Sequence, residues 1–232
     1  MKSKQLTIPV GADEQVSGIV CTPDSEPKDN AVGVIIAHGA GNDMQEPMIV
    51  KVCERLADAG HVTLRFNFVY REKGHKAPDP QAKLETTWEH VYRFFTESLP
   101  YNFKTVIVGG KSMGGRVASQ MAAAGKLSAQ GLILLGYPLH ATGKKDTLRD
   151  SHLYEMNIPM LFFAGTRDTL CDLSLLNGVL NKLKASWDLL VIEGGDHSFH
   201  LPKSANTGQE DVYNKVAERC NGWVQSVFLE TK

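Results

Sequence analysis

Residues 106 to 118 read V-I-V-G-G-K-S-M-G-G-R-V-A, and this stretch decides how the rest of the chain is interpreted. An apolar strand runs into the pentapeptide at 110–114, and a helix of small residues follows it. A nucleophile elbow needs this succession of buried strand, tight turn at the nucleophile and helix. Gly110 and Gly114 allow the sharp turn and close packing of helix on strand. We therefore predict that the Ser112 hydroxyl projects at the carboxyl edge of a sheet. The alternative is a glycine-rich turn without chemistry, because G-x-S-x-G also occurs by chance.

Two further polar side chains follow predicted strands in the order that this elbow requires. Asp168 comes after the apolar run at 159–165, and His197 lies in a glycine-flanked loop after the predicted strand 187–192. Taken singly, an aspartate there is typical of a turn or helix cap, and a histidine in a polar loop is typical of a solvated group. Together with Ser112 they give the chain order Ser, Asp, His, which is that of the α/β-hydrolase fold. We predict that these three residues form a catalytic triad.

Two other aspartates compete for the role of the acid. Asp172 lies past the end of the strand, where capping of a following helix explains it. Asp196 adjoins His197 in the chain and is poorly placed to bond its ring. Asp168 is therefore the predicted acid.

A second turn supplies the predicted oxyanion hole. The buried-type strand at 31–37 leads into His38-Gly39-Ala40-Gly41, where a hydrolase of this fold places a main-chain N–H group. We predict that the main-chain N–H groups of Ala40 and Met113 bind the oxyanion. For His38 we expect a role in ordering this loop.

The combination of motifs resembles a known family. The motifs are H-G-A-G at 38–41, R-F-N-F-x-Y-R-E at 65–72, G-G-K-S-M-G-G-R at 109–116, G-T-R-D at 165–168 and G-D-H-S-F at 195–199. They resemble the small dienelactone-hydrolase-like branch of the α/β-hydrolases, and within it the Tex/KANSL-type hydrolase-like proteins. The dienelactone hydrolases themselves have a cysteine where this chain has Ser112, so the resemblance does not imply their lactone substrate.

The order of predicted elements indicates one α/β domain over residues 1–232. A predicted antiparallel hairpin at 4–10 and 16–22 precedes alternating strands and helices, which favours a mostly parallel, twisted sheet with helices on both faces. Predicted helices cover 48–59, 80–98 and 211–229. The segment 137–158 stands where larger hydrolases insert a lid, but it is long enough only for a turn and a helix at 146–154. We expect no large cap domain and an open site.

The loop at 68–79 leaves the sheet at the edge where α/β proteins bind ligands. It either lines the pocket or forms a solvated charged loop. Our candidate pocket residues are His38, Phe68, Tyr70 and Lys111. Cys171 lies close to Asp168 in the chain, although packing explains it better than a place at the pocket.

Composition excludes several classes of function. The formal charge of −1 over 232 residues, with both signs interspersed, gives no basic surface for a nucleic acid. The first residues lack the apolar core of a signal peptide, and no apolar run reaches the length of a membrane span. The four cysteines, which are Cys21, Cys53, Cys171 and Cys220, are widely spaced and indicate neither a disulfide framework nor a zinc site. We expect a cytoplasmic protein without metal, cofactor, nucleic-acid partner or membrane contact.

These residues predict a serine hydrolase that cleaves a small acyl ester or thioester through an acyl-enzyme intermediate. An amidase, peptidase or acyltransferase would use the same triad with another leaving group or acceptor. A non-catalytic interaction module with this fold is the third possibility, although a scaffold has no physical need for Ser112, Asp168 and His197 together.

Overall fold

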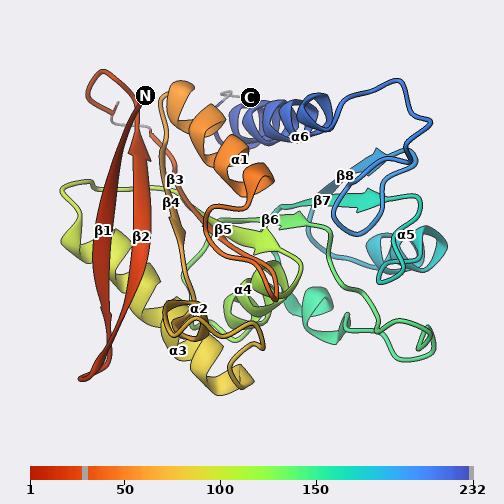
Figure 1. The fold of residues 1–232 in the computed structure, drawn as a ribbon, viewed down its shortest axis with the longest axis horizontal. Helices are drawn as coiled ribbons and strands as arrows, with labels where there is room; N and C mark the ends of the chain where they lie inside the picture. Colours follow the sequence, from red (N-terminus) through yellow and green to blue (C-terminus); the bar gives the residue numbers. More distant parts are fainter. Residues whose placement is uncertain (28–30, 230–232) are drawn as a thin grey trace.

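The computed structural model describes residues 1–27 and 31–229. Its centre is an eight-stranded sheet with the strand order β1-β2-β4-β3-β5-β6-β7-β8 (Figure 1). The strands are β1 (Lys2–Val10), β2 (Glu14–Thr22), β3 (Gly33–Ala37), β4 (Val62–Phe66), β5 (Val106–Lys111), β6 (Gly131–Leu135), β7 (Met160–Gly165) and β8 (Trp187–Ile192).

One edge of the sheet is antiparallel and the remainder is parallel. β1 pairs with β2 along its whole length, from Lys2 opposite Thr22 to Val10 opposite Glu14, and β2 pairs antiparallel with β4. The neighbouring strands from β4 to β8 pair in parallel. This arrangement confirms the predicted fold class and the N-terminal hairpin. Because parallel strands end at the same edge, the loops after β3, β5, β7 and β8 converge there.

Helices cover both faces of the sheet. They are α1 (Pro47–Asp58), α2 (Val69–Glu72), α3 (Gln81–Arg93), α4 (Met113–Ala123), α5 (Leu173–Leu180) and α6 (Gln209–Val224), with a 3₁₀ turn at η2 (Ser151–Glu155) and π-helical turns at η1 (Phe94–Ser98) and η3 (Gln225–Leu229). α1 and α6 pack on one face, whereas α3 and α4 pack on the other (Figure 1).

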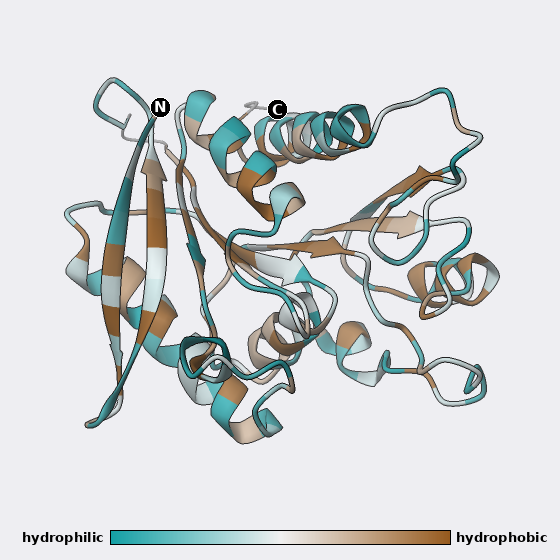
Figure 2. Ribbon diagram, in the orientation of Figure 1, coloured by the Kyte–Doolittle hydropathy of each residue, from teal (hydrophilic) through white to brown (hydrophobic). Residues whose placement is uncertain are grey.

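The central strands are apolar because they are covered on both sides. Every residue of β3, β5 and β6 is buried. β3 and β6 are mainly brown in Figure 2, whereas the helices show brown on only part of their surface. On α3 and η1 the side chains of Trp88, Val91 and Phe95 are inaccessible to solvent. Continuous apolar runs of this kind are typical of parallel strands between two helix layers.

The segment between β6 and β7 differs from the expectation. A helix was predicted at 146–154, but only Ser151–Glu155 is helical, as a 3₁₀ turn. The preceding residues turn back onto the chain instead, since the Arg149 N–H donates to the carbonyl of Leu139 at 2.8 Å. That bond fixes residue 149 in a loop conformation and delays the start of the helical turn.

No helix of the described residues has the length and apolarity needed to cross a membrane.

Candidate active site

Ser112 occupies a strained turn between β5 and α4. Its φ and ψ angles are 49° and −113°, in a region of backbone conformation that residues other than glycine rarely adopt. The turn is fixed from the neighbouring strand, because the Ser112 N–H donates to the carbonyl of Leu135 at 3.0 Å. Strain of this kind persists only where the surroundings determine it, and it is typical of a nucleophile elbow.

The elbow also depends on glycine at position 114. A Cβ atom there would lie 2.6 Å from the His38 carbonyl oxygen and 2.7 Å from that of Ala37. Real Cβ atoms do not approach backbone oxygens so closely. α4 therefore begins directly against the end of β3, which brings Ser112 beside the turn at His38-Gly39-Ala40.

The structure brings together the three residues predicted as a triad. His197 Nε2 lies 2.8 Å from Ser112 Oγ, and His197 Nδ1 lies 2.8 and 3.0 Å from the two carboxylate oxygens of Asp168. A carboxylate can only accept, so Nδ1–H donates to Asp168 and Nε2 accepts from the Ser112 hydroxyl. The Asp168 side chain is inaccessible to solvent and accepts a second bond of 2.8 Å from the Leu170 N–H.

The loops that carry Asp168 and His197 are bonded to each other. The Arg167 N–H donates to the Gly195 carbonyl at 2.8 Å, and the Gly194 N–H donates to the Thr166 hydroxyl at 2.8 Å. These bonds join the chain after β7 to the chain after β8. The acid and the histidine are therefore held at a fixed separation by backbone contacts.

Lys111 holds the loop that carries His197 by a hydrogen bond to its main chain. Its side chain is only 3% exposed, and its ammonium group donates a 2.6 Å hydrogen bond to the His197 carbonyl. Burial lowers the pKa of Lys111 from 10.5 to about 8. Lys111 was expected at the pocket, but it lies buried next to the histidine loop and does not line the cavity.

His38 orders the loop of the predicted oxyanion hole. Its Nδ1–H donates to the Gly39 carbonyl at 2.8 Å, and its Nε2 accepts from the Phe68 N–H at 3.1 Å. Burial lowers the pKa of His38 to about 4, so the ring is neutral at physiological pH. Among the described residues, the N–H groups of Ala40 and Met113 have no recorded hydrogen-bond acceptor. Both groups are available to a ligand.

A cavity of about 630 Å³ opens above Ser112. Its walls include Ala40 and Met113, and two arginines, Arg116 and Arg149, lie on its lining. Neither arginine is among the site residues predicted from the sequence. A signal existed for Arg116, because residues i and i+4 share one face of a helix, whereas nothing in the sequence places Arg149.

The four candidate pocket residues lie elsewhere. His38, Phe68, Tyr70 and Lys111 are each at most 3% exposed, and none of them is on the lining of this cavity. They are apolar or internally bonded: the Tyr70 hydroxyl, for example, donates to the Gly39 carbonyl at 3.4 Å. These four residues therefore hold the surrounding loops in place and do not face the cavity. The loop at 68–79 does contribute lining residues at its end, through Pro78 and Asp79.

The competing residues have structural explanations. Asp172 caps α5, because its carboxylate accepts from the N–H groups of Ser174 and Leu175 at 2.9 and 3.2 Å. Asp196 accepts from the N–H groups of Ser198 and His200. Cys171 is 1% exposed, and burial raises its pKa to about 12.

A second serine–histidine contact joins α4 to η2. His152 Nε2 is 2.9 Å from Ser119 Oγ. The Ser119 hydroxyl donates to the Arg116 carbonyl at 2.8 Å, so it accepts from the imidazole. Burial lowers the pKa of His152 to about 4. Ser119 is also inaccessible to solvent, and this pair therefore lacks the geometry of an activated nucleophile.

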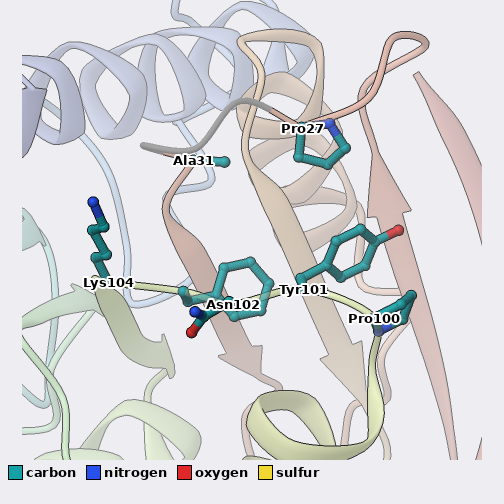
Figure 3. A pocket seen from close by; sticks show the side chains of 7 residues that line it. Pro27, Ala31, Pro100, Tyr101, Asn102 and Lys104 are labelled. Carbon is teal, nitrogen blue, oxygen red and sulfur yellow. The ribbon is translucent and has the colours of Figure 1, made fainter.

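A second cavity, of about 300 Å³, lies at the opposite edge of the sheet. Figure 3 shows Pro27, Ala31 and the segment 100–104 around it, before the starts of β3 and β5. Lys104 is the charged side chain among these described residues, and none of them is a histidine, cysteine or carboxylate.

Within residues 1–27 and 31–229, no group of three His, Cys, Asp or Glu side chains is arranged to hold a metal ion.

Comparison with known proteins identifies the family. A family model described as an alpha/beta hydrolase domain matches residues 30–225. The chain belongs to the alpha/beta hydrolase family. This assignment agrees with the sheet order and with an elbow after β5.

Solved structures share this alpha/beta hydrolase fold over the whole chain. An a/b serine hydrolase without lid from Xanthomonas campestris is 19% identical, with a TM-score of 0.76 and coverage of 100% of this chain and 97% of that one. Dienelactone hydrolase from Anabaena variabilis is 21% identical, with a TM-score of 0.72 and coverage of 97% of each chain. Est1E from Butyrivibrio proteoclasticus, solved with ferulic acid, is 17% identical, with a TM-score of 0.76 and coverage of 97% and 100%.

Proposed function

We propose that this protein is a serine hydrolase that cleaves a small acyl ester or thioester. The observation that carries the proposal is the continuous chain of hydrogen bonds from Ser112 through His197 to Asp168. It begins at a strained elbow with φ of 49° and opens into a cavity. The esterases among the structural neighbours support a hydrolytic reaction, as in the esterase domain of a Rhodothermus marinus protein. The finer resemblance to Tex/KANSL-type proteins rests on the sequence motifs.

The proposed reaction begins with proton transfer from Ser112 to His197. As Ser112 Oγ attacks the acyl carbonyl, Nε2 accepts its proton and Asp168 stabilises the imidazolium that forms. The N–H groups of Ala40 and Met113 donate to the oxyanion. The imidazolium then protonates the leaving group. A water molecule attacks the acyl-enzyme, with His197 again as the base.

The cavity favours a compact substrate. Its volume of about 630 Å³ lies within the usual range for small-molecule sites. The segment after β6 adds one 3₁₀ turn, Ser151–Glu155, in place of a cap, so the entrance stays open. We infer a small-molecule acyl substrate.

Hydrolysis of a 4-nitrophenyl ester series from acetate to decanoate tests the proposal. The wild type and the Ser112→Ala variant are compared at equal concentration. We expect turnover that depends on Ser112, with an optimum at short acyl chains. Equal rates for the two proteins at every chain length would contradict the proposed function.

A further inference from the structure

Two arginines share the cavity with Ser112. Arg116 is half-buried and lies one helical turn after the serine on α4, and its N–H closes the first turn on the Ser112 carbonyl at 3.0 Å. Long side chains on a helix point toward its N-terminus, which here is the end that carries Ser112. Arg149 reaches the cavity from the loop after β6.

Both guanidinium groups are bonded to neutral oxygens. Arg116 donates to the side-chain oxygens of Gln120 and Gln81 at 3.0 and 3.3 Å, and Arg149 donates to the Pro138 carbonyl at 3.1 Å. Over the described part of the chain, neither arginine is in an ion pair with a carboxylate. A guanidinium group has five N–H donors, so each arginine has donors left for a ligand.

The exposed Arg149 is nevertheless held in one place. Its N–H donates to the Leu139 carbonyl, and its own carbonyl accepts from the Tyr137 hydroxyl at 2.5 Å. With the side-chain bond to Pro138, three contacts fix this residue. Two of these contacts hold the main chain and one holds the guanidinium group. A guanidinium group that is already held loses less conformational entropy when it binds a ligand.

Carboxylates also lie near the two arginines. Asp79 is the carboxylate on the cavity lining, and one of its oxygens accepts from the Tyr70 N–H at 2.9 Å. Asp150 accepts from the Tyr154 hydroxyl at 2.6 Å. The described lining therefore has two guanidinium groups and one carboxylate, which leaves an excess of one positive charge. After burial, the positive charge of Arg149 contributes to lowering the pKa of Arg116.

We propose that Arg116 and Arg149 form an anion subsite beside Ser112, so that the preferred substrate is an ester or thioester that also carries a carboxylate or phosphoryl group. The planar guanidinium fork matches both groups. This inference rests on the proposed hydrolase function and adds the class of substrate to it.

A matched pair of esters tests the subsite. Mono-4-nitrophenyl adipate carries a free carboxylate, and 4-nitrophenyl methyl adipate is its neutral twin. We expect the wild type to prefer the charged ester in kcat/KM. Relative to the neutral ester, Arg149→Gln should lower kcat/KM for the charged ester by about 10-fold to 100-fold, the range of a charge-assisted hydrogen bond.

Three further variants complete the test. Arg116→Gln should act like Arg149→Gln, and Arg149→Lys should restore part of the preference. Arg93→Gln is the control for net charge, because Arg93 lies on the exposed side of α3 in an ion pair with Glu89. Equal turnover of both esters by the wild type, changed to the same degree by Arg149→Gln, would overturn the subsite while the hydrolase function stands.

A binding measurement separates this inference from the reaction itself. The Ser112→Ala protein is titrated with glutarate and with inorganic phosphate by calorimetry. Binding that is lost in Ser112→Ala/Arg149→Gln supports the subsite even if no ester is cleaved, and the tighter ligand identifies the carboxylate or phosphoryl group. Binding of neither ligand, or binding that survives the loss of Arg149, would overturn it.

Discussion

The Lys111 ammonium group donates to the main-chain carbonyl of His197, which lies 86 residues further along the chain, at 2.6 Å. The residue that precedes the elbow serine therefore supports the loop that carries the imidazole. Lys111 is buried and does not line the cavity, so we assign it a positioning role that acts through His197.

Replacement of Lys111 by methionine should slow the reaction without unfolding the protein. Methionine keeps much of the side-chain volume but removes the donor to the His197 carbonyl. Loss of one hydrogen bond from a charged donor predicts a fall in kcat of about 10-fold or more, with KM little changed. Ester kinetics and circular dichroism measure the two effects. Lys104→Met, an exposed lysine before the start of β5, is the matched control, and an equal effect there would contradict the positioning role.

The pH dependence of the free energy of unfolding should also reveal the titration of Lys111. Burial lowers its pKa in the folded protein from 10.5 to about 8, so between these values the unfolded chain binds more protons than the folded one. The free energy of unfolding contributed by this group therefore rises with pH over this window. Relative to Lys111→Met, the wild type should gain on the order of 3 kcal/mol between pH 8 and 10.5. Parallel pH curves in urea denaturation would show that the lysine titrates normally.

Two aspartates on either side of Cys171 should respond differently to amidation. Asp168→Asn removes the acceptor that orients His197, and we expect a fall in kcat of several thousandfold, on the order of the 10⁴ known for serine proteases. Asp172→Asn keeps a side chain that caps α5 equally well and removes the exposed ion pair with Lys145, so we expect a loss of about 0.5 kcal/mol of stability or less and little change in kcat. Steady-state kinetics and thermal unfolding of the two variants rank them, and the reverse ranking would identify Asp172 as the acid.

A single methyl group at position 114 should disrupt the elbow. The Cβ of Gly114→Ala would meet the carbonyl oxygens of Ala37 and His38, so α4 must move away from β3. We expect a marked loss of both activity and thermal stability. Gly178→Ala on α5, where a Cβ meets nothing within 4 Å, is the control and should be neutral or slightly stabilising. Wild-type melting and turnover in Gly114→Ala would contradict the close approach.

Much of the fold followed from the sequence because its signals are local. The apolar run before Ser112 and the small residues after it both describe nearby backbone, and the parallel topology then brings residues 168 and 197 to the same edge. The predicted helix at 146–154 was wrong over its first part, because residue 149 bonds to Leu139 instead of continuing a helix. A contact of that kind has no signature in the periodicity of the chain.

The supporting residues of the site were harder to predict than the triad. Tyr70 and Lys111 were expected at the pocket because they lie near the correct edge of the sheet, yet both side chains point into protein. Position along a strand predicts the edge that a residue reaches, but not whether neighbouring loops cover it. Arg149 was missed for the converse reason, since its place depends on bonds to Tyr137, Pro138 and Leu139.

Labelling by a fluorophosphonate is the sharpest test of Ser112 as the nucleophile, because the reagent requires an activated serine and not merely an exposed hydroxyl. The wild type, Ser112→Ala and Ser119→Ala are treated in parallel, and the modified peptide is located by mass spectrometry. Our account predicts modification of Ser112 in the wild type and in Ser119→Ala, and none in Ser112→Ala. Label on Ser119, or a wild type that stays unmodified, would contradict the assignment of Ser112 as the nucleophile.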